Sequence, residues 1–168
     1  MQPSRRSVLR AGGLGLATGL AGCLDSLRPG SGTSDDLALA SVDVNGSPGD
    51  EVAVQPAGST VVLDFFATWC QPCKPQMTEL RAVREQFPDL PMRSITTESD
   101  RDAVRTFWRE HDGNWPVLLD PELQASSTYD PRGFPTLFVF DADGEQVWDH
   151  TGLARSQDIA AAVERARS

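Results

Sequence analysis

Residues 60–75 read TVVLDFFATWCQPCKP. The first half of this stretch is almost entirely apolar, which is typical of a strand buried on both faces of a sheet. Cys70 and Cys73 follow it, with two residues between them. Pro75 fits only in the first turn of a helix, so a helix is expected to begin at about the cysteines. The stretch therefore predicts a buried strand, a turn that carries a Cys-x-x-Cys pair, and a helix.

The chain on either side alternates between strand and helix patterns. Apolar residues at spacings of three and four predict a helix from Cys73 to Phe87, which Pro88 stops. The other expected elements are strands at 41–44, 51–54, 92–95, 117–120, 136–140 and 145–150, a helix from a cap at Ser99 to about His111, and a last helix capped by Ser156. Trp108 and Trp115 are expected in the core. This order predicts an α/β fold with a mixed sheet.

The first 22 residues carry the pattern of an export signal. Arg5 and Arg6 precede an apolar segment that is well under the ~20 residues a membrane span needs. Residues 4–10, SRRSVLR, resemble the twin-arginine consensus, with Val8 where the consensus usually has Phe. The tetrapeptide LAGC that ends at Cys23 resembles a lipobox, in which the cysteine is lipidated and becomes the mature N-terminus. An ordinary export signal with an unlipidated cysteine is the alternative.

The segment that follows Cys23 is rich in Pro, Gly, Ser and Asp, so it is expected to be a flexible tether. The predicted division is a signal peptide at 1–22, the lipidated cysteine and tether at 23–40, and one domain at 41–168. A single acyl chain holds a protein only marginally, so a stable anchor would need a second chain on Cys23. We therefore expect an exported protein, anchored by lipid at the extracytoplasmic face of the membrane.

The balance of charged residues is strongly acidic. The net charge is -9 and the pI is about 4.6, so nucleic acid is not an expected partner. Cleavage before Cys23 would remove three arginines and no acidic residue, which lowers the net charge to -12. Lys74 is the only lysine, and 16 of the 24 acidic residues are Asp. This composition predicts adaptation to high salt, as in haloarchaea, although a GC-rich coding bias would give a similar one.

The number of cysteines limits the role of the pair. With Cys23 lipidated, only Cys70 and Cys73 remain, so one chain cannot form a zinc site of four cysteines. A site of two cysteines and two histidines would need His111 and His150, which are 39 positions apart. A purely structural disulfide across so small a loop would constrain the unfolded chain little. These exclusions favour a redox function for the pair.

Two segments together resemble a known superfamily. VVLDFFATWCQPCK, residues 61–74, followed about 60 residues later by Gly-Phe-Pro-Thr at 133–136, is similar to the thioredoxin-like superfamily. Residues 105–136, with the expected extra helix and strand at 100–120, resemble its TlpA/ResA branch of exported, membrane-tethered members. The resemblance covers about residues 40–166. It implies a thioredoxin fold, with a central mixed sheet flanked by helices, and a thiol–disulfide oxidoreductase activity.

The resemblance and the predicted helix start give the cysteines different roles. Cys70 is expected to be the more exposed thiol and to attack a substrate disulfide, because helix N-terminal N–H groups favour its thiolate. Cys73, one turn into the helix, would resolve the mixed disulfide. Lys74 could add positive charge next to the pair.

Other residues match the superfamily's site positions. Asp64 matches a buried carboxylate that relays the proton of Cys73, and Pro135 matches a cis-proline that packs beside the disulfide. The remaining positions expected to bind substrate or tune the pair are Trp69, Gln71, Pro72 and Phe134. The expected partners are protein thiols or disulfides and a transmembrane electron donor or acceptor, with no cofactor and no metal.

The sequence also departs from the TlpA/ResA pattern. Gln76 stands where that branch often has Glu, and Thr78 where it usually has Pro, so no particular substrate is inferred. Two alternatives stay open at this point. One is a copper metallochaperone with Cu(I) on the two cysteines and Met77, because thiolates and thioethers are soft ligands. The other is a redox-silent binding module.

Overall fold

The computed structural model describes residues 37–168. Its elements in chain order are β1 (Ala38–Ala40), β2 (Glu51–Ala53), β3 (Val61–Phe65), α1 (Cys73–Gln86), β4 (Met92–Thr96), α2 (Arg101–Glu110), β5 (Val117–Leu119), α3 (Gln124–Tyr129), β6 (Thr136–Phe140), β7 (Gln146–Thr151) and α4 (Ser156–Ala166). Five strands form one sheet in the order β5-β4-β3-β6-β7, and β1 and β2 form a separate pair. The predicted α/β fold with a mixed sheet is confirmed, including the additional helix α2 and strand β5.

Strand β3 is the central strand, and all five of its residues are buried. It pairs in parallel with β4 and antiparallel with β6, which makes the sheet mixed. Side chains alternate along a strand, so Val62 and Asp64 point to one face of the sheet while Leu63 and Phe65 point to the other. Asp64 is the only charged residue of this strand.

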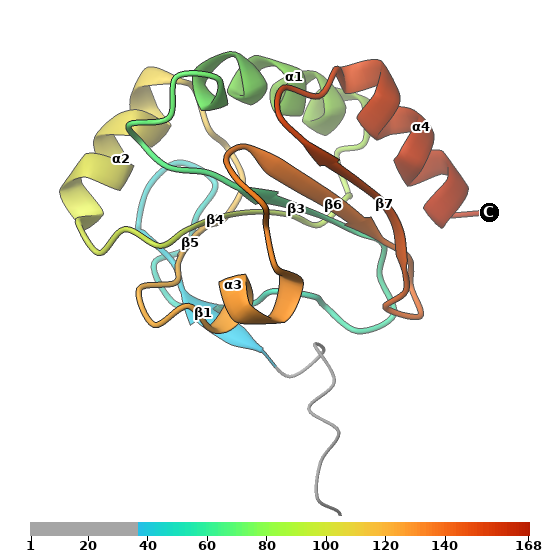
Figure 1. The fold of residues 1–168 in the computed structure, drawn as a ribbon, viewed down its shortest axis with the longest axis horizontal. Helices are drawn as coiled ribbons and strands as arrows, with labels where there is room; N and C mark the ends of the chain where they lie inside the picture. Colours follow the sequence, from blue (N-terminus) through green and yellow to red (C-terminus); the bar gives the residue numbers. More distant parts are fainter. Residues whose placement is uncertain (1–36) are drawn as a thin grey trace, which may run out of the picture. The chain divides into compact units, whose positions relative to one another are not determined.

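Helices α1, α2 and α4 lie on one face of the sheet, and α3 and β1 lie on the other (Figure 1). Val62 belongs to the apolar cluster that also holds residues of α1, α2 and α4. Leu63 and Phe65 belong to the second cluster, with Leu39 from β1 and Ala125 from α3. Asp64, which shares a face with Val62, therefore lies on the side of the sheet that the three long helices cover.

The strand predicted at 41–44 is wrong. The first strand is β1, three positions earlier, which pairs with β2 and lies inside the segment expected to be tether. Val44 and Ser47 instead exchange backbone hydrogen bonds of 3.3 and 2.8 Å across a tight turn. Gly46 occupies that turn with φ 73°, and a Cβ there would lie 2.1 Å from the carbonyl carbon of Asn114. The chain reverses there, so no strand forms at 41–44.

Two predicted helix caps are also wrong, and one helix was not predicted. The carboxylate of Asp100, rather than Ser99, accepts the first N–H groups of α2. Ser156 is the first residue of α4, and its N–H donates to Glu79 of α1 at 2.7 Å. The short helix α3 follows Asp120, whose buried carboxylate accepts N–H groups of the first turn of α3.

The predicted export signal, Cys23 and most of the tether lie outside the described residues. Within 37–168, no helix combines the length and the apolar character that crossing a membrane requires.

Candidate active site

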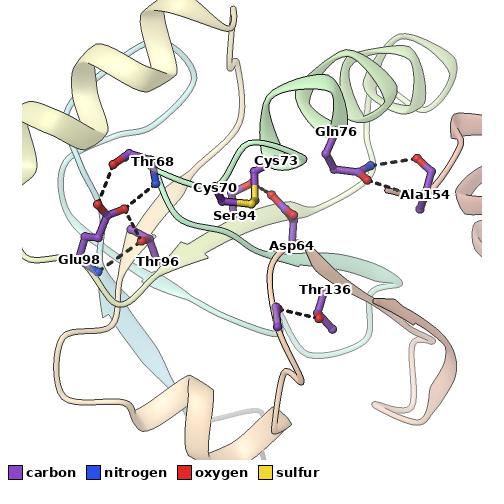
Figure 2. Close-up of a disulfide and its surroundings, with 11 residues drawn as sticks. Asp64, Thr68, Cys70, Cys73, Gln76, Ser94, Thr96, Glu98, Thr136 and Ala154 are labelled. Carbon is purple, nitrogen blue, oxygen red and sulfur yellow. Dashed lines mark hydrogen bonds between the residues drawn. A yellow bond between two sulfur atoms is a disulfide. The ribbon is translucent and has the colours of Figure 1, made fainter. Parts of the chain in front are cut away.

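The two cysteines lie where β3 gives way to α1, and they form a disulfide (Figure 2). Cys73 is the first residue of α1 rather than one turn into it, with Pro72 as the N-cap residue. Cys70 lies three positions earlier, and its N–H donates to the carbonyl of Ala67 at 3.1 Å. In the disulfide form both are buried, with 4% of Cys70 and 1% of Cys73 exposed. The first turn of α1 contains Lys74 and no acidic residue. No carboxylate of that turn therefore offsets the positive end of the helix dipole.

A carboxylate from the loop after β4 holds the segment that leads into the cysteines. Glu98 accepts the backbone N–H and the hydroxyl of Thr68, each at 2.7 Å. It also accepts the hydroxyl of Thr96 at 3.1 Å (Figure 2). Thr68, two residues before Cys70, is therefore held by two hydrogen bonds to a carboxylate, one from its backbone and one from its hydroxyl. Hydrogen bonds to a charged acceptor are stronger than neutral ones. The sequence analysis did not identify Glu98 or Thr68, because their pairing joins residues 30 positions apart.

Trp69, Phe134 and Pro135 are the apolar residues that the sequence predicted for the site. The Phe134–Pro135 peptide bond is cis, which is the geometry that the resemblance implied. The ring of Trp69 meets that of Phe134 edge-on, with 6.0 Å between centroids. Trp69 is 68% exposed, so it is not a core aromatic. The site thus has an accessible aromatic surface next to the cis-proline.

The residues between and after the cysteines differ in burial. Gln71 and Pro72 are exposed, as residues that approach a partner would be. Gln76 is buried and pairs with the backbone of Ala154, accepting its N–H at 2.8 Å and donating to its carbonyl at 3.2 Å (Figure 2). At the position where the TlpA/ResA branch often has Glu, this chain has an amide that joins α1 to the loop before α4.

Asp64 is a buried ionisable group on the strand that leads to the pair. Only 2% of it is exposed, and its side chain points from β3 toward the disulfide (Figure 2). Burial raises the pKa of its carboxyl from 3.8 to about 7, and a hydrogen bond from Ser94 opposes part of that rise. Its Oδ1 has no hydrogen-bond partner among the described residues. A buried carboxyl that titrates near neutral pH can accept and return a proton under working conditions.

Two further residues connect to this carboxyl. The hydroxyl of Ser94, on β4, donates to Oδ2 of Asp64 at 2.7 Å. The indole Nε1 of Trp115 donates to Ser94 Oγ at 2.9 Å. Trp115 was predicted only as a core residue, and both it and Trp108 are fully buried. Ser94 was not predicted at all, since a serine in a strand carries no pattern that indicates its partner.

The segment that carries the cysteines follows β3, and the last residue of β3, Phe65, pairs with Thr136, the residue after Pro135. The C-terminal end of β3 therefore brings together the predicted site residues Asp64, Trp69, Cys70, Gln71, Pro72, Cys73, Phe134 and Pro135. Among residues 37–168, no group of three or more His, Cys, Asp or Glu side chains is placed to hold a metal ion.

This fold and this cysteine pair define a thioredoxin-fold protein, and comparison with known proteins agrees. The Redoxin family pattern matches residues 35–163, and the chain belongs to that family. The thiol-disulfide oxidoreductase ResA of Bacillus cereus is 30% identical over 92 residues, which are 54% of this chain and 53% of that protein. The chain thus spans about half the length of this curated relative.

Two solved structures show the same fold. StoA from Bacillus subtilis superposes with a TM-score of 0.64 at 18% identity, over 75% of this chain and 94% of that one. The exposed lipoprotein thioredoxin Etrx1 from Streptococcus pneumoniae has a TM-score of 0.64 at 23% identity, over 77% and 98% of the two chains. At these identities the likeness establishes the thioredoxin fold alone.

Proposed function

We propose that the protein is a thiol–disulfide oxidoreductase that exchanges the Cys70–Cys73 dithiol and disulfide with protein substrates. The observation that carries this proposal is a disulfide at the N-terminus of α1 with the buried carboxyl of Asp64 pointing toward it. A structural disulfide needs no proton acceptor, whereas a dithiol that must become nucleophilic does. The ResA relative, which carries the name of this activity, supports the same function.

In the reducing direction the exchange has two steps. The thiolate of Cys70 attacks one sulfur of a substrate disulfide, which breaks that bond and releases the other substrate sulfur as a thiolate. Cys73 then gives its proton to Asp64 and attacks Cys70, which breaks the mixed disulfide and forms the Cys70–Cys73 disulfide. Two electrons have passed to the substrate, and a thiol donor must return them for the next cycle. The same steps in reverse oxidise a substrate dithiol.

The position of each cysteine supports different roles for the two residues. Cys70 precedes α1, where helix N–H groups and the dipole lower the pKa of a free thiol. Cys73 is the more buried of the two and lies on the side of Asp64 (Figure 2). Cys70 is therefore the attacking thiol and Cys73 the resolving one.

The substrate would bind on the apolar surface around the cis-proline. Trp69 is 68% exposed and Leu153 is 36% exposed, and both are large apolar residues. The residue before Leu153, Gly152, donates its N–H to the carbonyl of Pro135 at 2.8 Å, which holds this loop against the cis-proline. Exposed apolar side chains around a reactive group are typical of a surface that contacts a protein partner. An extended segment of an unfolded or partly folded protein fits these features.

Export and a lipid anchor at Cys23 are part of the same proposal. They are supported by the twin-arginine and lipobox patterns of the first 23 residues. A thiol protein outside the membrane needs an electron source or sink, so a transmembrane partner would reduce or oxidise the pair.

Trapping experiments test the proposal. Cys73→Ser keeps the attacking thiol and removes the resolving one, so it should accumulate mixed disulfides with substrates. Cys70→Ser should trap nothing and should not reduce insulin. Asp64→Asn should slow insulin reduction while alkylation of Cys70 stays as fast as in the wild type. If both cysteine variants keep full reductase activity, the protein is not this kind of enzyme.

A further inference from the structure

A chain of hydrogen bonds occupies one oxygen of the buried carboxyl. Trp115 donates to Ser94 at 2.9 Å, and Ser94 donates to Oδ2 of Asp64 at 2.7 Å. Ser94 and Trp115 are fully buried and Asp64 is 2% exposed, so solvent does not compete for these contacts. Oδ1 of Asp64, by contrast, has no hydrogen-bond partner in the described part of the chain.

The chemistry of the three groups fixes the direction of the chain. An indole N–H can only donate, so Ser94 Oγ must be the acceptor of the Trp115 contact. A carboxylate can only accept, so while Asp64 is ionised the hydroxyl hydrogen of Ser94 is directed to Oδ2. Oδ2 of the carboxylate therefore already accepts a hydrogen bond. Oδ1 has no such partner among the described residues and is the oxygen free to take a proton.

We infer that Trp115 and Ser94 are positioning residues that occupy Oδ2 and so make Oδ1 the atom that takes and returns the proton of Cys73. This inference rests on the proposed function, since it assigns the atom used in the resolving step. Neither residue touches the sulfur atoms in this scheme; both act through Asp64.

Within residues 37–168, no charged side chain contributes to the altered pKa of Asp64. Its neighbours in register are Ser94 on β4 and Leu137 on β6, and Cys73 and Met77 of α1 lie in the apolar cluster on the same face of the sheet. Burial and the Ser94 hydrogen bond are the two causes of the altered pKa of Asp64, and no charged residue contributes.

The opposing signs of these two causes give a measurable consequence. Burial disfavours the carboxylate, and the hydrogen bond from Ser94 favours it. Loss of the Ser94 hydroxyl should therefore raise the pKa of Asp64 above its value of about 7. One hydrogen bond to a charged acceptor corresponds to a rise of about 1 in pKa.

The test is a titration of the oxidised protein, in which the cysteines form the disulfide and cannot titrate. The carboxyl ¹³C signal of Asp64, assigned by its loss in Asp64→Asn, is followed with pH in the wild type and in the variants. In Ser94→Ala the pKa should rise by about 1. In Ser94→Thr, which keeps the hydroxyl, it should return to near the wild-type value. In Trp115→Phe it should rise by less, because the serine hydroxyl remains but is free to turn away.

The neighbouring tryptophan provides a matched control. Trp108 is also fully buried and meets Trp115 edge-on at 5.1 Å, but its Nε1 donates to the backbone carbonyl of Asn45 at 3.2 Å. Trp108→Phe therefore removes an indole hydrogen bond from the same part of the core and leaves in place both hydrogen bonds of the chain to Asp64. It should leave the pKa of Asp64 unchanged.

An unchanged pKa of Asp64 in Ser94→Ala would overturn the inference. If that variant does not fold, the comparison of Trp115→Phe with Trp108→Phe decides instead, and equal pKa values in those two would overturn it as well. The proposed function is tested separately, by the insulin-reductase activity of the two cysteine variants. If Asp64→Asn reduces insulin as fast as the wild type, Asp64 takes no proton in turnover, and the inference is overturned even where the cysteine variants support the proposed function.

Discussion

Asp64→Asn should stabilise the folded protein at alkaline pH. The carboxyl has a pKa of about 7 in the folded state, raised by burial, against about 3.9 in an unfolded chain. Between these two values the folded state holds a proton that the unfolded state has released. The free energy of unfolding therefore falls as pH rises from about 4 to about 7 and is then constant, as far as this group is concerned.

The size of the effect follows from the difference between the two pKa values. A difference of about 3 in pKa, at 1.36 kcal/mol for each pKa unit, lowers the free energy of unfolding by about 4 kcal/mol at pH 8.5. Only about 1.5 kcal/mol of this decrease is already present at pH 5. Asparagine has the shape of aspartate, cannot ionise, and can accept the Ser94 hydrogen bond. The stabilisation by Asp64→Asn should thus grow by about 3 kcal/mol from pH 5 to pH 8.5.

Urea unfolding of the oxidised protein at both pH values measures this growth. Asp120→Asn is a suitable control, because Asp120 is also buried but both of its oxygens accept hydrogen bonds at the start of α3. That control should lower the free energy of unfolding at both pH values. If the difference between Asp64→Asn and the wild type is the same at pH 5 and pH 8.5, the carboxyl does not hold its proton in the way we describe.

Three further predictions concern the active-site loop, the surface charge and the anchor. Glu98→Gln should lower the free energy of unfolding by about 1–2 kcal/mol and slow insulin reduction, since one of the hydrogen bonds to Thr68 is lost. Glu110 is exposed, so Glu110→Gln is the control, and equal behaviour of the two variants would exclude a role for Glu98. The melting temperature should fall at low ionic strength, because unscreened carboxylates repel in a chain of net charge -9; an equal value in molar and low-millimolar salt would remove the case for salt adaptation. Cys23→Ser should leave the protein as unprocessed precursor or release it from the membrane, as fractionation and mass analysis would show; normal processing with membrane retention would exclude the lipid anchor.

The centre of the fold was predictable because its signals are local in the sequence. The apolar run that forms β3, the Cys-x-x-Cys pair and Pro75 lie within 16 residues and specify strand, turn and helix start together. The predicted helix start at Cys73 is confirmed. The placement of Cys73 one turn into that helix is wrong, because a proline permitted in the first turn does not say which residue of that turn it is.

The network around Asp64 was not predictable, because its partners are distant along the chain. Ser94 is 30 positions from Asp64, and Trp115 is another 21 positions from Ser94. Only the register of β3 with β4 brings the serine opposite the aspartate. Strand β1 and helix α3 escaped prediction for a different reason: both are short, and neither repeats a pattern long enough to show a period.

The reduction potential of the Cys70–Cys73 pair tests the central claim most directly. The protein is equilibrated in thiol–disulfide buffers of known potential, its free thiols are alkylated, and the two forms are separated by mass. A redox-active pair should interconvert reversibly as a two-electron couple, with a midpoint between about −120 and −270 mV, the range of thiol–disulfide oxidoreductases. A midpoint below about −300 mV, as structural disulfides have, or a pair that cannot be reduced without unfolding, would contradict the account.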